Sequence, residues 1–352
     1  MKEHNELLLK CEESYAFWGR GREAQNDHEL KFATKPEVYL DALQTRLDGR
    51  AGFHSKIATS RLLKRLDEIR PDVVHLHNLH GYYINIEMLF NWLATQNCKV
   101  EWTLHDCWAF TGHCAHFTYA KCTQWQTHCA YLEKCPQLNI YPKTICKKSC
   151  ARNFEDKYRL FTSISFERMK IITPSCWLEG LIGQSFLGDY PIEVRHNTID
   201  TTIFKPTQSD FRERYGIGAR FMILGVASPW TERKGLGDFI RLAKELDSEK
   251  YIVVLVGLSK KQMRALPENI VGLPRTSSSQ QLAEIYSSAD VFFNPTLEDN
   301  YPTVNLEAEA CGTPVVTYDT GGCRETIQLE SSRCISPLSF SLVCSTLEGL
   351  TR

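Results

Sequence analysis

The sequence predicts an α/β protein built from two doubly wound domains. Short apolar runs that fit buried parallel strands alternate with helical segments through most of its 352 residues. A chain of this length can bury two separate cores. Its 43% hydrophobic and 24% charged content is ordinary for a globular protein. One stretch, residues 107–150, breaks the alternation and is rich in Cys, His, Trp and Tyr, so we interpret it as an insertion in the first domain.

The first domain is predicted to cover residues 1–206. Apolar periodicity and Pro punctuation predict these elements in order: a helix at 57–69, a strand at 72–77, a helix at 84–93, a strand at 98–104, a long helix from about 153, a strand at 170–175 and a helix that starts near 176. His105 and Asp106 follow the strand predicted at 98–104, at its C-terminal end. Open α/β sheets bind ligands at this end of their strands.

The second domain is predicted to cover residues 207–352 and is more regular. Strands are expected at 221–226, 251–256, 290–294 and 314–318, and helices at 235–246, 279–288, 302–311 and 322–328. Strands that alternate with helices in this way indicate a parallel sheet with helices on its faces.

Charge and hydropathy exclude several classes of protein. The formal net charge of −1 gives no overall field toward nucleic acid or anionic lipid. No apolar run approaches the length of a membrane span. The first ten residues are too charged for a signal peptide, so we expect a cytoplasmic protein.

Two acids, Asp299 and Glu307, bracket the start of the helix predicted at 302–311. The backbone N–H groups near Thr303 and Val304 have no partner within that helix, and Pro302 in its first turn has no N–H to satisfy, so this end can hold an anion. Carboxylates can hold sugar hydroxyls on either side. Backbone amides that bind phosphate, next to carboxylates that bind hydroxyls, suit a sugar nucleotide. The structural alternative is a helix whose first turn is simply capped by acids.

Two cations, Arg233 and Lys234, stand between a predicted strand and the next helix. They can neutralise a diphosphate and the charge that grows on it as a glycosidic bond breaks. A solvated charge pair is the structural alternative, but cations at a helix N-terminus oppose its dipole, which favours function.

The acidic segment resembles the acid-x7-acid signature of the retaining GT-B glycosyltransferases of family 4. The run Ala310-Cys-Gly-Thr-Pro-Val-Val strengthens the match, and the form Glu298-Asp-Asn-Tyr-Pro is similar to the branch that builds colanic acid, other exopolysaccharides and O-antigen. The resemblance covers roughly residues 15–328. It departs from the family in having Asp299 where Glu is usual and Ser228 where an Arg is usual.

The resemblance implies the GT-B fold, with two Rossmann-like domains facing a cleft, the first on the acceptor side and the second binding the nucleotide sugar. It places His105 against the donor sugar, Glu298 or Asp299 on the hydroxyls of that sugar, and Glu307 on the ribose. The diphosphate would lie against Lys234, Thr303 and Val304, with Arg233 in the role of the family's missing Arg. No metal is expected in catalysis.

The implied function is transfer of a hexose from a nucleotide-sugar donor to a growing, lipid-linked bacterial cell-surface polysaccharide. Compared with the family, the chain is expected to be shortened at both ends. The alternative is therefore a truncated, non-catalytic remnant that still binds sugar nucleotides. A third interpretation is a zinc-organised interaction module fused to an α/β domain.

Seven of the fourteen cysteines fall between Cys107 and Cys150. In a reducing compartment such clustering favours metal over disulfides. Four of them, Cys114, Cys122, Cys129 and Cys135, suit a tetrahedral structural zinc, and their order resembles that of the colanic-acid-type transferases. The alternatives are buried free thiols, a disulfide, or Cys146 or Cys150 as competing ligands.

A basic run, Lys143 to Arg152, follows this cluster. It could contact the phosphate of a lipid-linked acceptor or an anionic membrane at the inner face of the plasma membrane, and the alternative is a solvated face. No nucleic-acid partner is expected.

Overall fold

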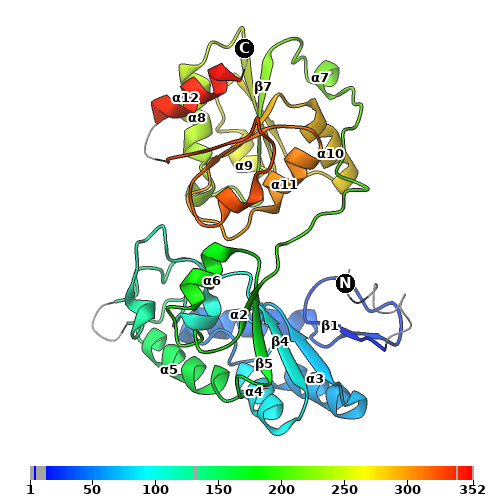
Figure 1. Ribbon diagram of the computed structural model, residues 1–352, viewed down its shortest axis with the longest axis vertical. Helices are drawn as coiled ribbons and strands as arrows, with labels where there is room; N and C mark the ends of the chain where they lie inside the picture. Colours follow the sequence, from blue (N-terminus) through cyan, green and yellow to red (C-terminus); the bar gives the residue numbers. More distant parts are fainter. Residues whose placement is uncertain (1–3, 5–12, 131–133, 338–339, 351–352) are drawn as a thin grey trace. The chain divides into compact units, whose positions relative to one another are not determined.

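The computed structural model describes residues 4, 13–130, 134–337 and 340–350, which form two compact units (Figure 1). Unit 1 comprises Met1–Thr173 and Leu178–Val194, and unit 2 comprises Pro174–Trp177 and Arg195–Arg352. The sequence placed the boundary at 206/207, whereas the contacts divide the chain at 194/195.

The described residues of unit 1 form two parallel sheets. The larger has the strand order β3 (Val73–Leu76), β4 (Lys99–Thr103), β5 (Met169–Thr173) and β6 (Ile192–Val194), and the smaller pairs β1 (Ala16–Trp18) with β2 (Glu29–Lys31). The helices are α2 (Lys35–Asp48), α3 (Lys56–Ile69), α4 (Ile86–Thr95), α5 (Ser149–Phe161) and α6 (Cys176–Ile182), the last of which begins in unit 2. Phe90, Trp102 and Phe161 pack together at the core, with ring centroids 4.6 to 5.4 Å apart.

Unit 2 has one parallel sheet with helices on both faces. Its strand order is β12 (Arg333–Ile335), β11 (Val315–Tyr318), β10 (Val291–Asn294), β7 (Phe221–Val226), β8 (Tyr251–Val256) and β9 (Ile270–Leu273). Figure 1 shows α8 (Leu236–Glu245) and α12 (Phe340–Gly349) on one side of the sheet, and α10 (Ser279–Ser288) and α11 (Thr303–Ala310) on the other. Two separate apolar clusters fill the two faces. Short helices α7 (Phe211–Arg214) and α9 (Lys260–Met263) complete the unit.

The predicted α/β class with parallel sheets is confirmed, and the strands at 221–226 and 251–256 match in full. One predicted element is wrong. Instead of a helix at 322–328 there is a 3-10 turn, Cys323–Thr326, and the chain is extended again at Ile327. The Thr326 hydroxyl accepts a hydrogen bond from Asn305 Nδ2 at 2.8 Å, which ties this turn to α11.

Other differences concern element ends and omissions. The long helix begins at Ser149 rather than near 153, and Pro302 stands just before α11 as its N-cap. The elements that the sequence did not predict include β2, α2, β6, α7, α9, β9, β12 and α12.

The Cys-rich stretch folds around aromatic side chains. Its regular elements among the described residues before α5 are two 3-10 turns, Trp108–Phe110 and Gln124–Gln126. Phe110, Phe117 and Trp125 pack with centroids 4.9 to 6.2 Å apart. In the part of the chain that the structure describes, no helix is long and apolar enough to cross a membrane.

Candidate active site

The two predicted cations of unit 2 reach the acidic loop that follows β10. Lys234 Nζ forms an ion pair with the carboxylate of Asp299. Arg233 Nη1 donates a 2.6 Å hydrogen bond to the carbonyl oxygen of Glu298. Glu298 itself is buried, at 2% exposure. The residues at 233–234 and 298–299, which are far apart in sequence, therefore form one charged cluster.

The helix that follows this cluster, α11, begins at Thr303 without a side-chain cap. Its first-turn N–H groups, including those of Thr303 and Val304, lie at the positive end of the helix dipole, next to the loop that carries Asp299. This is the arrangement that binds phosphate groups.

Buried polar side chains hold this helix and its loop in place. Asn305 Oδ1 accepts a 2.8 Å hydrogen bond from Asn294 Nδ2 at the end of β10. Ser175 Oγ donates to Asn300 Oδ1 at 2.6 Å. Because each of these groups is buried, an unpaired state would be unfavourable, so the bonds fix where α11 starts.

Two glycines that the sequence interpretation did not assign to the site shape the acidic loop. Gly321 has φ +57°, and a Cβ there would lie 1.7 Å from the carbonyl oxygen of Asp299. A Cβ at Gly322 would lie 2.0 Å from the carbonyl oxygen of Asn300. The Gly322 N–H donates to Asp299 O at 3.2 Å. In the sequence, the Gly-Gly pair just after the strand predicted at 314–318 could have indicated a close backbone approach at this loop.

Glu307 stands one turn into α11 and accepts a hydrogen bond from a buried tyrosine. The Tyr286 hydroxyl donates to Glu307 Oε2 at 3.1 Å. Burial raises the pKa of Glu307 to about 7, and the hydrogen bond from Tyr286 works in the opposite direction. Burial disfavours the ionised form of Glu307. Hydroxyl groups of a ligand would stabilise that form by donating further hydrogen bonds to it.

This environment makes a prediction for stability against pH. The pKa of Glu307 rises from 4.5 to about 7 on folding, so between these pH values the folded state holds a proton that the unfolded state has lost. The neutral carboxyl group therefore contributes its full stability below pH 4.5. This contribution is lost as the pH rises through 7 and the buried group ionises. We expect the free energy of unfolding of Glu307→Gln to exceed that of the wild type by roughly 3 kcal/mol well above pH 7 and to match it at acid pH. Urea midpoints at both pH values measure this, with exposed Glu268→Gln as the control. An offset that is the same at both pH values would contradict it.

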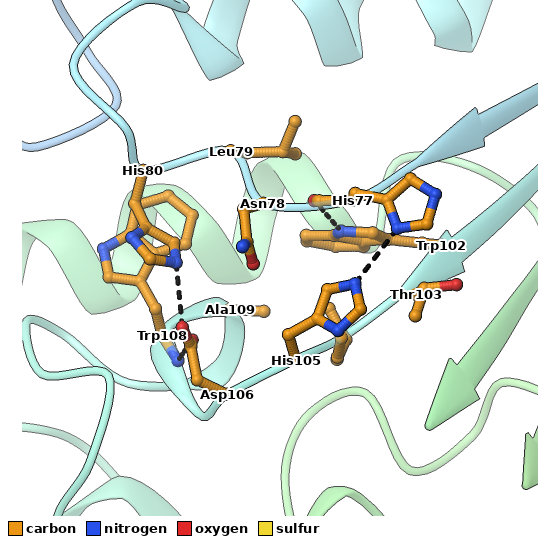
Figure 2. A pocket seen from close by; sticks show the side chains of 11 residues that line it. His77, Asn78, Leu79, His80, Trp102, Thr103, His105, Asp106, Trp108 and Ala109 are labelled. Atoms are coloured by element: carbon orange, nitrogen blue, oxygen red, sulfur yellow. Dashed lines mark hydrogen bonds and ion pairs between the residues drawn. The ribbon is translucent and has the colours of Figure 1, made fainter. Parts of the chain in front are cut away.

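In unit 1, His105 lies two residues after β4 and faces His77, which directly follows β3 (Figure 2). His77 Nδ1 and His105 Nε2 share a 3.0 Å hydrogen bond, and their rings stack at 5.4 Å. Burial lowers the pKa of His77 to about 4 and also lowers the pKa of His105. Both imidazoles are therefore neutral at pH 7, and the shared bond fixes the tautomer of His105 relative to that of His77. The alternation His75-Leu-His77 was the sequence signal for this partner.

Asp106 is paired with a residue that the sequence did not single out. Its Oδ2 lies 3.0 Å from His80 Nε2, and its Oδ1 accepts the Trp108 N–H at 2.9 Å. Burial alone would raise the pKa of Asp106, but His80 and the Trp108 N–H lower it. These side chains line a cavity of about 10 Å³, enough for one water. Asp106 therefore holds the loop after β4, next to His105 (Figure 2).

The cysteines predicted to bind zinc interact with one another inside the Cys-rich stretch. Burial raises the pKa of Cys114, and Cys135, Cys129 and Cys122 raise it further by repulsion. A hydrogen bond from Cys150 lowers the pKa of Cys135 to about 7. Soft thiols in such a cluster are suitable zinc donors. However, among the described residues no group of three or more His, Cys, Asp or Glu side chains is arranged to hold a metal ion. Zinc binding therefore stays a prediction from the sequence.

Comparison with known proteins shows which proteins this chain resembles. Residues 208–337 match the model of the glycosyl transferases group 1 family. The putative colanic acid biosynthesis glycosyl transferase WcaC of Escherichia coli (strain K12) is 25% identical over 284 residues, which are 76% of this chain and 64% of that protein. The α-galactosylglucosyldiacylglycerol synthase of Streptococcus pneumoniae (strain ATCC BAA-255 / R6) is 31% identical over 127 residues, 32% of this chain and 33% of that one. This chain thus spans less than two thirds of the length of either relative.

Solved structures agree on the fold. Sucrose-phosphate synthase from Thermosynechococcus elongatus superposes with a TM-score of 0.68 at 14% identity, over 99% of this chain and 82% of that one. Anabaena HepE in complex with UDP-glucose gives a TM-score of 0.57 at 14% identity, over 84% of this chain and 72% of that one. This chain therefore has the GT-B fold, and its residues 208–337 are similar to the group 1 glycosyltransferase domain.

Proposed function

We propose that this protein is a retaining glycosyltransferase that moves a hexose from a nucleotide sugar to a growing, lipid-linked cell-surface polysaccharide. The observation that supports it best is the cluster in which Lys234 and Arg233 reach the acidic loop before the uncapped start of α11. The similarity to the colanic acid biosynthesis transferase supports the pathway, and the UDP-glucose complex of the Anabaena neighbour supports the class of donor.

In this proposal the donor diphosphate lies against the N–H groups of Thr303 and Val304 and the side chains of Arg233 and Lys234. Lys234 is paired with Asp299 in the structure, so a bound phosphate would compete for the ammonium group. Transfer of Lys234 to the phosphate would leave the Asp299 carboxylate available for hydroxyls of the donor sugar, with Glu298 beside it. Glu307 would accept the ribose hydroxyls.

The chemistry that follows is substitution with retention at the anomeric carbon. Charge grows on the leaving diphosphate as the glycosidic bond breaks, and the helix dipole, Lys234 and Arg233 stabilise it. The leaving phosphate oxygen takes the proton of the acceptor from the same face. Neutral His105, with its tautomer set by the bond to His77, is proposed to support a hydroxyl of the donor sugar.

Two measurements test this function. Calorimetry of the full chain with UDP-glucose, UDP-galactose, GDP-mannose and GDP-fucose should show binding of at least one donor. Release of nucleoside diphosphate should then rise when a polyprenyl-diphosphate-linked oligosaccharide is added as acceptor. Donor binding with no release under any acceptor would instead identify a non-catalytic remnant. If no donor binds, the result would favour the third interpretation, a zinc-organised interaction module fused to an α/β domain.

The Cys-rich stretch and the location of the protein complete the proposal. We propose a structural zinc on Cys114, Cys122, Cys129 and Cys135, with no metal in catalysis, and a cytoplasmic enzyme. Metal analysis of protein purified without chelators tests the first point, and less than about half an equivalent of zinc would count against it.

A further inference from the structure

Two arginines follow β1 in the run Gly19-Arg-Gly-Arg22, and their surroundings differ. Arg22 pairs with Glu29 and lies over the ring of Trp18 at 4.7 Å. Arg20 is exposed, and among the residues that the structure describes no carboxylate pairs with it. Its Nη1 donates one long hydrogen bond, 3.4 Å, to the carbonyl oxygen of Gly81. Because a guanidinium group has five N–H donors, most of the binding capacity of Arg20 is left for a ligand.

The backbone that carries Arg20 is fixed by the ring of Tyr83. A Cβ at Gly19 would lie 2.2 Å from this ring and a Cβ at Gly81 would lie 2.0 Å from it, so both glycines are packed against the tyrosine. The Tyr83 hydroxyl in turn donates to the carbonyl oxygen of Asn78. Arg20 is therefore exposed but stands on backbone that is held in one place, which reduces the entropy lost when a ligand binds.

Three phenol groups lie within electrostatic range of Arg20. Burial raises the pKa values of Tyr82, Tyr83 and Tyr141, that of Tyr83 to about 12. The charge of Arg20 acts against each of these shifts, and all three groups are neutral hydroxyls at pH 7. The rings of Tyr82 and Tyr141 meet edge-on, with centroids 5.7 Å apart. Tyr82 has φ +63°, a conformation that is uncommon outside glycine and is concentrated at functional sites.

The same group of side chains reaches the loop that carries His105. The Tyr141 hydroxyl donates to the carbonyl oxygen of His80 at 2.7 Å, and its oxygen lies 3.2 Å from His80 Nδ1. His80 Nε2 lies 3.0 Å from Oδ2 of Asp106, the residue after His105 (Figure 2). The loops after β1, β3 and β4 therefore meet the Cys-rich stretch here, at the C-terminal ends of the strands, where open α/β sheets bind ligands.

We propose that Arg20, Tyr82 and Tyr141 bind the carboxylate of an acidic sugar in the acceptor. A guanidinium group binds a carboxylate through two parallel hydrogen bonds, and a phenol hydroxyl can donate a third. Arg46 also acts on Tyr82, but the buried carboxyl group of Asp41 acts on it with the opposite sign. The charge of the subsite therefore suits a single negative charge better than a diphosphate. This inference rests on the proposed function, because it names the class of acceptor for the same enzyme.

Ligand-observed NMR titrations of the full chain test the subsite with three probes: methyl β-D-glucuronoside, methyl β-D-glucoside and glucose 6-phosphate. We expect the glucuronoside to bind more tightly than the other two. Arg20→Gln should weaken its binding about 10- to 100-fold, because the charge-assisted bonds are lost, and Tyr82→Phe should weaken it about fivefold. Arg20→Lys should recover only part of the affinity, because an ammonium group cannot form the parallel pair of bonds.

Lys64→Gln is the matched control, because it also removes one exposed positive charge from unit 1 but lies on α3, outside the subsite. It should bind like the wild type. Since Arg20 is exposed, Arg20→Gln should melt at the wild-type temperature. The proposal would be overturned by wild-type protein that does not prefer the glucuronoside, by equal binding in Arg20→Gln, or by Arg20-dependent binding of glucose 6-phosphate alone.

The probes need no donor, so the subsite and the proposed function can fail separately. Release of nucleoside diphosphate by a protein without Arg20-dependent glucuronoside binding would refute the subsite alone. Arg20-dependent binding in a protein that transfers no sugar would refute the proposed function alone.

Discussion

Replacing Glu307 with Ala is expected to weaken nucleotide-sugar binding by about 100-fold or more, since charge-assisted hydrogen bonds to two ribose hydroxyls contribute about 1.5 to 3 kcal/mol each. The side chain lies in α11 with the Tyr286 hydroxyl 3.1 Å from Oε2, so it is held in one orientation before the donor arrives. Calorimetry with the donor selected from the panel measures the loss. The titration should be run above pH 7, where Glu307 is ionised, because burial raises its pKa to about 7.

Two further variants separate binding from folding. Glu307→Gln keeps the shape and the hydrogen bond from Tyr286 but removes the charge, so its affinity should fall between those of the wild type and of Glu307→Ala. Glu268→Ala, at an exposed position of unit 2, should bind donor normally. An unchanged affinity in Glu307→Ala would refute the assignment of the ribose to this residue.

Replacing Lys234 with Met is expected to lower kcat by about 100- to 1000-fold, the range seen when one preorganised donor to a developing negative charge is lost. Lys234 supplies a full positive charge beside the start of α11, so its removal acts on the transition state more than on the ground state. The rate of nucleoside diphosphate release at saturating donor and acceptor measures the effect.

The ion pair with Asp299 requires its own control, because Lys234→Met leaves that carboxylate without its partner. The double variant Lys234→Met, Asp299→Asn removes both charges and shows how much of the loss comes from an unpaired acid. Lys244→Met, on the exposed side of α8, should be as active as the wild type. A kcat within a factor of about two of the wild type in Lys234→Met would remove Lys234 from the mechanism.

Much of unit 2 could be predicted because each of its strands is a local signal. Residues 221–226 and 251–256 are apolar runs bounded by turn residues, and both form buried strands. The region 322–328 misled the prediction because its conformation is set by a contact with Asn305, which sequence periodicity does not contain. Helix α2 was missed for a related reason: its buried positions are polar and are satisfied by Ser55 on another element.

The sequence by itself determined the class of fold, the family resemblance and the identity of the charged groups, because strand periodicity and motif spacing are local properties of the chain. Only the tertiary structure decided which of those groups meet. It paired Lys234 with Asp299 and His105 with His77, placed Gly321 against the Asp299 carbonyl, and brought Arg20 to the Gly81 carbonyl. Such contacts join residues that are distant along the chain, and their geometry depends on how separate elements pack.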